Sequence, residues 1–259
     1  MIERFIKRMA PVAALALGTA LGGCNMDFKV NGMDGVPLAE LDMSGPAPTE
    51  LVLASGDRVV LTEGDTLAIT VDGDPAETDK LRFSLDEETL GITREEGSWG
   101  SGSAVTVNVT MPPPGEIVIA GSGTVLAPTL AKDAEITIGG SGDIEIERIA
   151  ADSLEVTIGG SGSVKGAGTA TKLEVSIGGS GDVDLAGLKV DEAEITIGGA
   201  GDVAFASDGT VQADIAGSGD VRVTGRAKCE VNAVGSGKLT CAPAADTEPA
   251  DAVIEAPEG

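Results

Sequence analysis

Acidic side chains recur at fixed positions in the second half of the chain, where they could bind cations. The tripeptide Gly-Ser-Gly, once replaced by Gly-Ala-Gly, repeats every 18 to 20 residues, with its central residue at Ser122, Ser141, Ser161, Ser180, Ala200, Ser218 and Ser236. Glutamates stand six positions before this centre, at Glu135, Glu155, Glu174, Glu194 and Glu230, with Gln212 in the same place. Aspartates stand two positions after it, at Asp143, Asp182, Asp202 and Asp220.

These two acidic rows allow two interpretations. If successive repeats stack in register, like charges within a row lie about 4.8 Å apart, which destabilises a sheet unless something screens them. The rows are then either a solvated acidic face or a surface where loosely held divalent cations bridge neighbouring carboxylates. A dedicated calcium site is not predicted, because the nonapeptide Gly-Gly-x-Gly-x-Asp places its Asp one residue further on than Gly-Gly-Ser-Gly-Asp does here.

The repeated serines are interpreted as corner residues and not as nucleophiles. The 259-residue chain has no His, the usual base that activates a serine, and the Gly-x-Ser-x-Gly elbow is missing. We therefore expect no enzyme activity, no catalytic residue and no cofactor. The formal net charge of -25 also makes nucleic acid an unexpected partner, because phosphate binding requires a basic patch.

Two cysteines bracket the last repeat. Cys229 lies seven positions before the centre of that repeat and Cys241 five positions after it, and we expect both side chains to point inward. A disulfide between them would link the two sides of the terminal repeat and contribute roughly 2 to 4 kcal/mol of stability. The other interpretation is a pair of small buried thiols.

The residues between these positions predict how the chain folds. Apolar residues alternate with polar ones on both sides of each Gly-Ser-Gly, which is typical of strands with one buried face. A repeat of this length gains stability only by stacking on its neighbours. We therefore predict an all-β protein, a parallel β-helix with about seven regular coils over residues 116–241. Residues 49–115 also alternate but are expected to lie out of register with the repeat, as irregular strands that cap the first end.

The N-terminal segment predicts export and lipidation. Residues 1–23 combine a positively charged head with a short apolar stretch, the pattern of a secretory signal peptide. The following Leu-Gly-Gly-Cys resembles the lipobox of bacterial lipoproteins, which makes Cys24 the lipidated residue and the membrane the partner reached through it. Asn25 favours the outer membrane of a Gram-negative bacterium by resemblance to lipoprotein sorting rules. Residues 24–48 are predicted to form a tether, and residues 242–259 a disordered acidic tail.

Together these features resemble one bacterial family. The lipobox, the segment Leu-Thr-Glu-Gly-Asp at residues 61–65, the Val-Thr-Val-Asn-Val-Thr-Met-Pro segment at 105–112 and the tandem Gly-Ser-Gly units are similar to the family of the putative auto-transporter adhesin, head GIN domain. The resemblance implies a β-helix without catalysis and supplies no binding residues. We expect a structural or adhesive module of the cell envelope. The alternatives are a β-helix that binds or, less expectedly, cleaves polysaccharide, and an envelope assembly or stress accessory that binds a protein.

Overall fold

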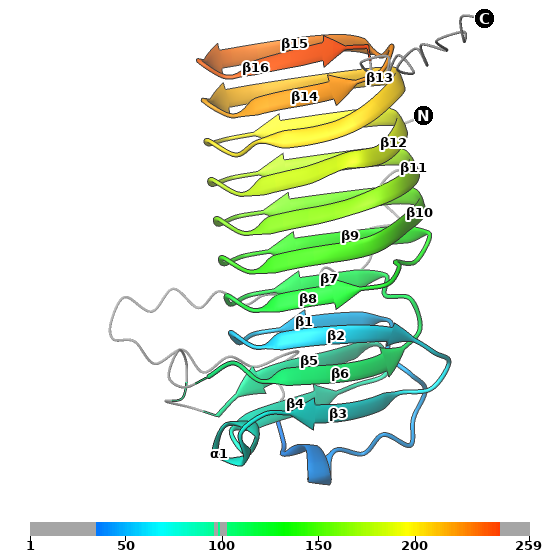
Figure 1. Cartoon of the computed structure of the whole chain (residues 1–259), viewed down its shortest axis with the longest axis vertical. Helices are drawn as coiled ribbons and strands as arrows, with labels where there is room; N and C mark the ends of the chain where they lie inside the picture. The colour runs from blue at the N-terminus through cyan, green and yellow to red at the C-terminus, as the bar shows by residue number, and fades with distance from the viewer. Residues whose placement is uncertain (1–34, 96–97, 99–102, 244–259) are drawn as a thin grey trace, which may run out of the picture.

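The computed structural model describes residues 35–95, 98 and 103–243, which form an elongated stack of β-strand coils (Figure 1). The strands are β1 (Glu50–Leu53), β2 (Arg58–Glu63), β3 (Ala68–Asp72), β4 (Leu81–Leu85), β5 (Thr89–Arg94), β6 (Thr106–Met111), β7 (Glu116–Ile119), β8 (Thr124–Ala127), β9 (Asp133–Ile138), β10 (Asp143–Ile158), β11 (Ser163–Ile177), β12 (Asp182–Ile197), β13 (Val203–Gly217), β14 (Asp220–Thr224), β15 (Lys228–Gly235) and β16 (Lys238–Ala242). Two short helices, the 3-10 helix η1 (Leu38–Glu40) and α1 (Pro75–Thr78), lie at the N-terminal end. Within the described ranges, no helix has the length and apolarity needed to span a bilayer.

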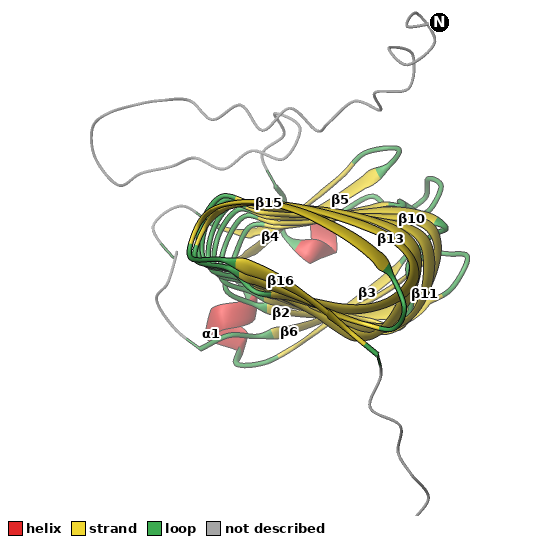
Figure 2. Cartoon of the chain, turned by 90° about the horizontal axis from the view of Figure 1, so that it is seen from above, coloured by secondary structure: helices red, strands yellow, loops and turns green. Residues whose placement is uncertain are grey.

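Each regular coil places two strand segments on opposite sides of a flattened cross-section, which Figure 2 shows along the axis. Face 1 contains β5, β1, β7, β9, the C-terminal parts of β10 to β13, and β15. Face 2 contains β6, β2, β8, the N-terminal parts of β10 to β13, β14 and β16. All pairs between these segments are parallel. The Gly-Ser-Gly corner leads from face 1 to face 2, while β10 to β13 bend around the opposite corner.

Inward side chains form continuous columns along the stack. Ile138, Ile158, Ile177 and Ile197 occupy equivalent registers in successive coils, and none is more than 2% exposed. Burial of one such side chain contributes about 1.5 to 3 kcal/mol, so the columns supply the main driving force for folding. The predicted parallel β-helix of about seven regular coils is confirmed.

The recurring glycines let the corners of successive coils approach closely. A Cβ atom on Gly160 would overlap the carbonyl oxygen of Gly140, one coil below, and a Cβ on Gly162 would overlap that of Gly142. Both clashes are with backbone atoms, which cannot move aside without shifting a whole coil. The corner glycines are therefore required mainly by backbone packing between coils, and a left-handed backbone occurs at few of them, such as Gly217 and Gly235.

The first strands of the chain lie inside the stack and not at its end. β1 pairs with β7 on one side and with β5 on the other, in parallel. Leu51 and Leu53 are in register with Ile117 and Ile119 of the first regular coil. The prediction that residues 49–115 lie out of register with the repeat is therefore wrong for β1 and β2. The segment Ala-Ser-Gly-Asp at 54–57 takes the place of the Gly-Gly-Ser-Gly corner, which hid this coil from the repeat pattern.

This stacking order requires the chain to pass a coil that an earlier part of the sequence occupies. After β6, the chain must cross the level of β2 to begin β7, a distance of two coil spacings or about 10 Å. The connection contains Pro112, Pro113 and Pro114. An extended polyproline segment advances about 3.1 Å per residue, so these residues span the crossing without forming strand pairs of their own.

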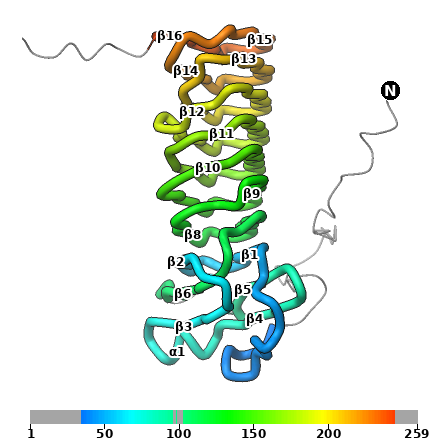
Figure 3. Tube along the Cα trace, turned by 90° about the vertical axis from the view of Figure 1, so that its right-hand side faces the viewer, coloured from blue at the N-terminus to red at the C-terminus, as the bar shows by residue number. Residues whose placement is uncertain are grey.

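Antiparallel strands close the N-terminal end, which Figure 3 shows below the coils. β3 pairs antiparallel with β6 and β4 with β5. Where this cap meets the coils, the fully buried Asp57 accepts hydrogen bonds from Arg94 Nη2 at 2.6 Å and Nε at 2.9 Å, and Arg94 Nη1 donates to Glu77 of α1 at 2.8 Å. Burial opposes ionisation of Asp57, but the hydrogen bonds from Arg94, the Val105 amide and Ser55 hold its pKa below the ordinary value.

The end of the predicted tether is part of this cap. Val36 forms a two-way backbone hydrogen-bond pair with Phe83 at 2.8 Å, and Leu38 and Leu41 pack against the core. The predicted tether, residues 24–48, is therefore wrong for residues 36–41, which belong to the folded cap. Cys24, the signal segment 1–23 and residues 244–259 of the tail lie outside the described residues.

Candidate functional site

The predicted glutamates form one straight row on the outside of face 1. Residue-for-residue pairing between neighbouring strands aligns Glu135, Glu155, Glu174 and Glu194 along the axis. The structure extends this row past β9 to Glu116 of β7 and Glu50 of β1. At the other end Gln212 interrupts it before Glu230. We call these seven glutamates the glutamate row.

Two members of the glutamate row were missed in the sequence. Glu116 stands six positions before Ser122, so the spacing used for the other members also identifies it. Glu50 could not be found in this way, because the corner that follows it reads Ala-Ser-Gly-Asp and lacks the Gly-Ser-Gly signal. Only the register between β1 and β7 shows that it belongs to the row.

Stacked carboxylates make this face electrostatically strained near its capped end. Burial, together with the neighbouring charges of Glu50 and Glu135, raises the pKa of Glu116 to about 7. Burial also raises the pKa of Glu155, with contributions from Glu135 and Glu174. Across the described ranges, the only ion pair that this row makes joins Glu174 to Lys172, at 3.1 Å. The row is therefore a line of acidic groups with few internal partners.

The predicted aspartates form a second row on face 2, but their surroundings differ. Asp182 accepts a hydrogen bond from the Asp202 amide at 3.1 Å, and Asp202 accepts one from the Asp220 amide at 2.9 Å. Ser163 donates to Asp143 at 2.5 Å. Asp220 also lies 3.3 Å from Lys238. Because these carboxylates accept hydrogen bonds from the next coil, the aspartate row is part of the stacking structure.

A shallow groove of about 280 Å³ opens beside the gap in the glutamate row. Its polar lining includes Lys172, Glu194, Thr210, Gln212 and Lys228. Thr210 and Gln212 belong to β13, and Thr210 is shorter than Glu192 of β12 and Lys228 of β15, which lie on either side of it. The groove offers charges of both signs and hydrogen-bonding groups, but at this volume it lies just below the usual range of small-molecule pockets.

The outer surface of the described coils lacks aromatic platforms. Phe83 and Phe205, the two aromatic residues within the described ranges, are 1% and 0% exposed. Trp99 lies outside the described residues. A glycan-binding β-helix usually stacks sugar rings on exposed aromatic side chains, so the described faces provide only polar contacts for a glycan.

No assembled metal-binding cluster occurs within residues 35–95, 98 and 103–243. Groups of three or more His, Cys, Asp or Glu side chains in positions to hold one metal ion are not found in these ranges. The acidic side chains instead form lines, with neighbours one coil apart. Such lines can attract cations along their length, but they do not surround one ion.

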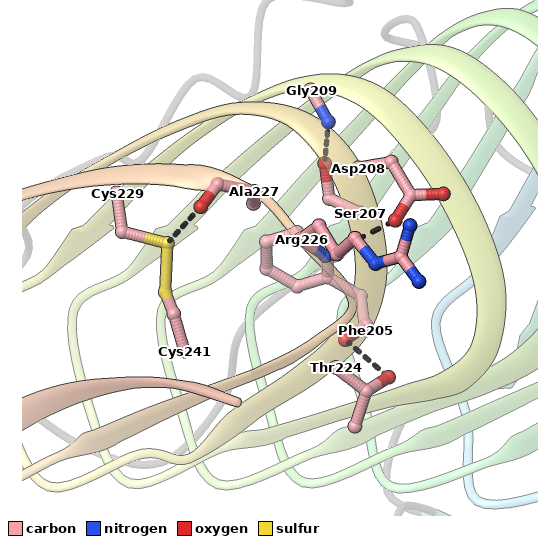
Figure 4. The surroundings of a disulfide bond; sticks show 9 residues. All are labelled: Phe205, Ser207, Asp208, Gly209, Thr224, Arg226, Ala227, Cys229 and Cys241. Carbon is pink, nitrogen blue, oxygen red and sulfur yellow. Dashed lines mark hydrogen bonds between the residues drawn. A yellow bond between two sulfur atoms is a disulfide. The ribbon is translucent and has the colours of Figure 1, made fainter. Parts of the chain in front are cut away.

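The two cysteines of the last coil are joined by a disulfide, with their Cα atoms 6.8 Å apart (Figure 4). Cys229 is in register with Val211, and Cys241 with Val223, so both stand in inward columns as expected. They are nevertheless exposed, because no described residue lies above this coil. The disulfide therefore links face 1 to face 2 at the open end of the stack.

Comparison with known families identifies one match. The model of the family described as "putative auto-transporter adhesin, head GIN domain" matches residues 47–227. The match thus includes β1 to β6 as well as the regular coils up to β14. No curated protein shows significant similarity to the chain.

Three crystal structures of bacterial proteins have a similar fold. A putative adhesin from Bacteroides fragilis NCTC 9343 has a TM-score of 0.66 and 18% identity, covering 77% of this chain and 94% of that one. A putative lipid binding protein from Parabacteroides distasonis ATCC 8503 has a TM-score of 0.61 and 19% identity, covering 77% and 94%. A putative adhesin from Parabacteroides merdae ATCC 43184 has a TM-score of 0.56 and 16% identity, covering 76% and 92%. At these identities the likeness shows a common fold alone.

Proposed function

Because the chain belongs to the family of the putative auto-transporter adhesin, head GIN domain, we propose that it is a non-catalytic envelope lipoprotein whose solenoid acts as an adhesive or structural module. The observation that carries this proposal is the shape of the outer surface. Face 1 presents a long, regular row of carboxylates, and the groove beside it is shallow. Such a surface suits extended contact with another surface better than it suits turnover of a small substrate.

Lipidation of Cys24 would hold the solenoid at the membrane. The Leu-Gly-Gly-Cys segment supports this step, and the acyl chains of a lipoprotein contribute about 0.8 kcal/mol for each buried CH₂ group. We place the anchored protein at the outer membrane of a Gram-negative bacterium. Mass spectrometry of the N-terminal peptide tests the anchor. An acylated Cys24 supports it, whereas an unmodified or absent Cys24 in the mature chain contradicts it.

The adhesive role can be tested on face 1. We expect beads coated with the full chain to bind envelope or host-surface preparations, and the fourfold variant Glu135→Gln, Glu155→Gln, Glu174→Gln and Glu194→Gln to lose that binding. The matched control neutralises four exposed acidic residues outside this row, with Glu145→Gln, Glu147→Gln, Asp184→Asn and Asp191→Asn. Equal loss in both variants would point to net charge and not to face 1. Turnover of a glycan by the wild type would contradict the non-catalytic assignment.

A second candidate role for the glutamate row is weak binding of divalent cations. The observation in its favour is that burial and like charges raise the pKa values of Glu116 and Glu155, so a cation between coils would relieve repulsion. We expect millimolar calcium to raise the midpoint of thermal unfolding at matched ionic strength, and the fourfold glutamine variant to show a smaller increase. Equal midpoints with and without calcium would exclude this role.

A further inference from the structure

The terminal coil at the C-terminal end leaves apolar side chains and strand edges uncovered. Val231 of β15 is 44% exposed, although Ile195 and Ala213, which precede it in the same inward column, are 0% exposed. Val234 of β15 is 79% exposed. Among the described residues, β15 pairs only with β13 and β16 only with β14, so each of these two strands has one unpaired edge.

Two unpaired edges on one coil restrict what can cover it. A repeat protein requires a terminal unit that covers its last apolar layer, and an unpaired strand edge can pair with another chain. The edges of β15 and β16 lie on opposite faces, so an occupant that satisfies both must present two strands with the same separation. The terminal coil of a second copy has this geometry. The capped end does not offer both edges, because Val36 already bonds to Phe83 at the edge of β4.

The disulfide fixes which residues face one another across the terminal coil. The Cα atoms of Cys229 and Cys241 lie 6.8 Å apart, on opposite faces. β15 and β16 run in opposite directions away from the corner between them. Two residues closer to that corner on each strand, Val231 of β15 therefore faces Leu239 of β16. Both are in register with buried inward residues of the preceding coil, so they form the centre of the uncovered apolar layer.

We propose that two copies of the chain associate through their terminal coils, related by a twofold axis that passes through Val231 and Leu239. In this arrangement β15 pairs antiparallel with β15 of the second copy, and β16 pairs with β16. Both sheets then continue from one copy into the other, and the Val231 and Leu239 side chains of the two copies form one closed apolar layer. The contact is isologous, so the assembly stops at two copies.

The two strands are self-complementary in this register. The pairs that lie directly opposite, with one member from each copy, are Lys228 with Val234, Cys229 with Ala233, Glu230 with Asn232 and Lys238 with Thr240. None of these pairs brings like charges together, which would destabilise antiparallel strands. The exposed Val234 lies against the aliphatic part of Lys228. Moving the axis by one residue, to Glu230, would place two glutamates opposite each other, so charge also selects the register.

The size of this contact predicts a reversible dimer. β15 has 8 residues and is about 26 Å long, and packed sheets lie about 10 Å apart. An end of these dimensions offers less than the standard interface of about 800 Å² on each partner. We therefore expect a dissociation constant in the micromolar range. In the dissociated chain the terminal coil stays free to open. The proposal does not depend on the adhesive role.

Sedimentation velocity of the full chain over a range of concentrations tests the association. We expect the wild type to shift from monomer to dimer, and Val231→Lys to stay monomeric, because the twofold axis brings the two lysines together. The matched control is Met43→Lys, which changes an exposed hydrophobic residue between η1 and β1 and should leave the dimer intact. A monomeric wild type, or association that survives Val231→Lys, would overturn the proposal. Assemblies larger than a dimer would also overturn it, since the contact would then not be isologous.

Two substitutions of an exposed residue on face 2 test the register without changing the apolar layer. Thr240 of β16 is in register with the exposed Arg222, and in the dimer it lies opposite Lys238 of the second copy. Thr240→Glu adds two pairs of opposite charge and should tighten the dimer about fivefold, whereas Thr240→Lys should weaken it by a similar factor. Equal dissociation constants for these two variants would contradict the proposed pairing.

Discussion

The N-terminal and C-terminal ends of this solenoid differ in how their terminal coils are covered and held. At the N-terminal end, antiparallel strands cover the last coil, and the buried Asp57 and Arg94, together with the partly exposed Glu77, join three separate segments. At the C-terminal end, the described chain stops at an exposed coil that is held by one disulfide. The first end is thus closed by non-covalent contacts between distant residues, whereas the described part of the second end is open and carries a covalent link within one coil.

The difference suggests how each end contributes to stability. The buried network at the N-terminal end cannot open without exposing the core of β1, β2 and β5, so its loss should affect unfolding of the whole rod. Within the described ranges, the terminal coil contacts other coils on one side only, so we expect it to open locally. The predictions below test this distinction.

The largest effect is expected from Arg94→Ala at the N-terminal end. The substitution leaves the fully buried Asp57 carboxylate without its charged partner, and removal of one partner from a buried pair typically costs about 3 to 5 kcal/mol. Urea unfolding of the full chain measures this change. The control is Arg82→Ala, whose pair with Glu95 lies at 2.7 Å but is partly exposed and should contribute only about 0 to 1 kcal/mol. Similar losses in both variants would mean that the buried network does not stabilise this end.

A smaller global effect is expected when the disulfide is removed. The double variant Cys229→Ser and Cys241→Ser opens a loop with a sequence separation of 12, for which chain entropy predicts about 3 kcal/mol if the terminal coil unfolds with the rest. We expect the main urea transition to shift by less than about 1 kcal/mol, because this coil opens by itself. Hydrogen exchange should accelerate in β15 and β16. A shift of the main transition by the full 3 kcal/mol would show that the two ends are equally coupled to the rod.

The regular part of the fold was predictable from the sequence because its signals are local and repeated. Alternating apolar residues at fixed distances from each Gly-Ser-Gly identify the inward columns, as Ile138 and Ile158 illustrate. The members of the glutamate row other than Glu50 follow from the same spacing.

The capped end could not be predicted in the same way because its contacts are long-range and unrepeated. Asp57 and Arg94 are 37 residues apart, and neither stands in a recognisable motif. β1 lies between β5 and β7 in the sheet, although it precedes both of them in the sequence. This order requires the crossing at Pro112 to Pro114. A repeat pattern assumes that consecutive segments are stacked consecutively, and this assumption fails here.

The smallest effect concerns the pH dependence of the glutamate row near the capped end. The pKa of Glu116 is raised from 4.5 to about 7, so the folded chain binds this proton more tightly than the unfolded chain does. The stabilisation that accompanies protonation is therefore complete below pH 4.5 and is lost as the pH rises through about 7. Because the side chain is partly exposed, we expect a loss on the order of 1 kcal/mol.

Glu116→Gln should remove this loss, since the amide stays neutral at every pH while keeping the shape of the protonated acid. Urea unfolding at about pH 4.5 and pH 8 measures the slope, and Glu230→Gln, in the same row on the exposed terminal coil, is the matched control. Burial is the first cause of the raised pKa, so high salt should weaken only the part due to Glu50 and Glu135. If Glu116→Gln leaves the slope unchanged, the repulsion in the row is already screened at the capped end. The row would then be electrostatically alike at both ends of the rod.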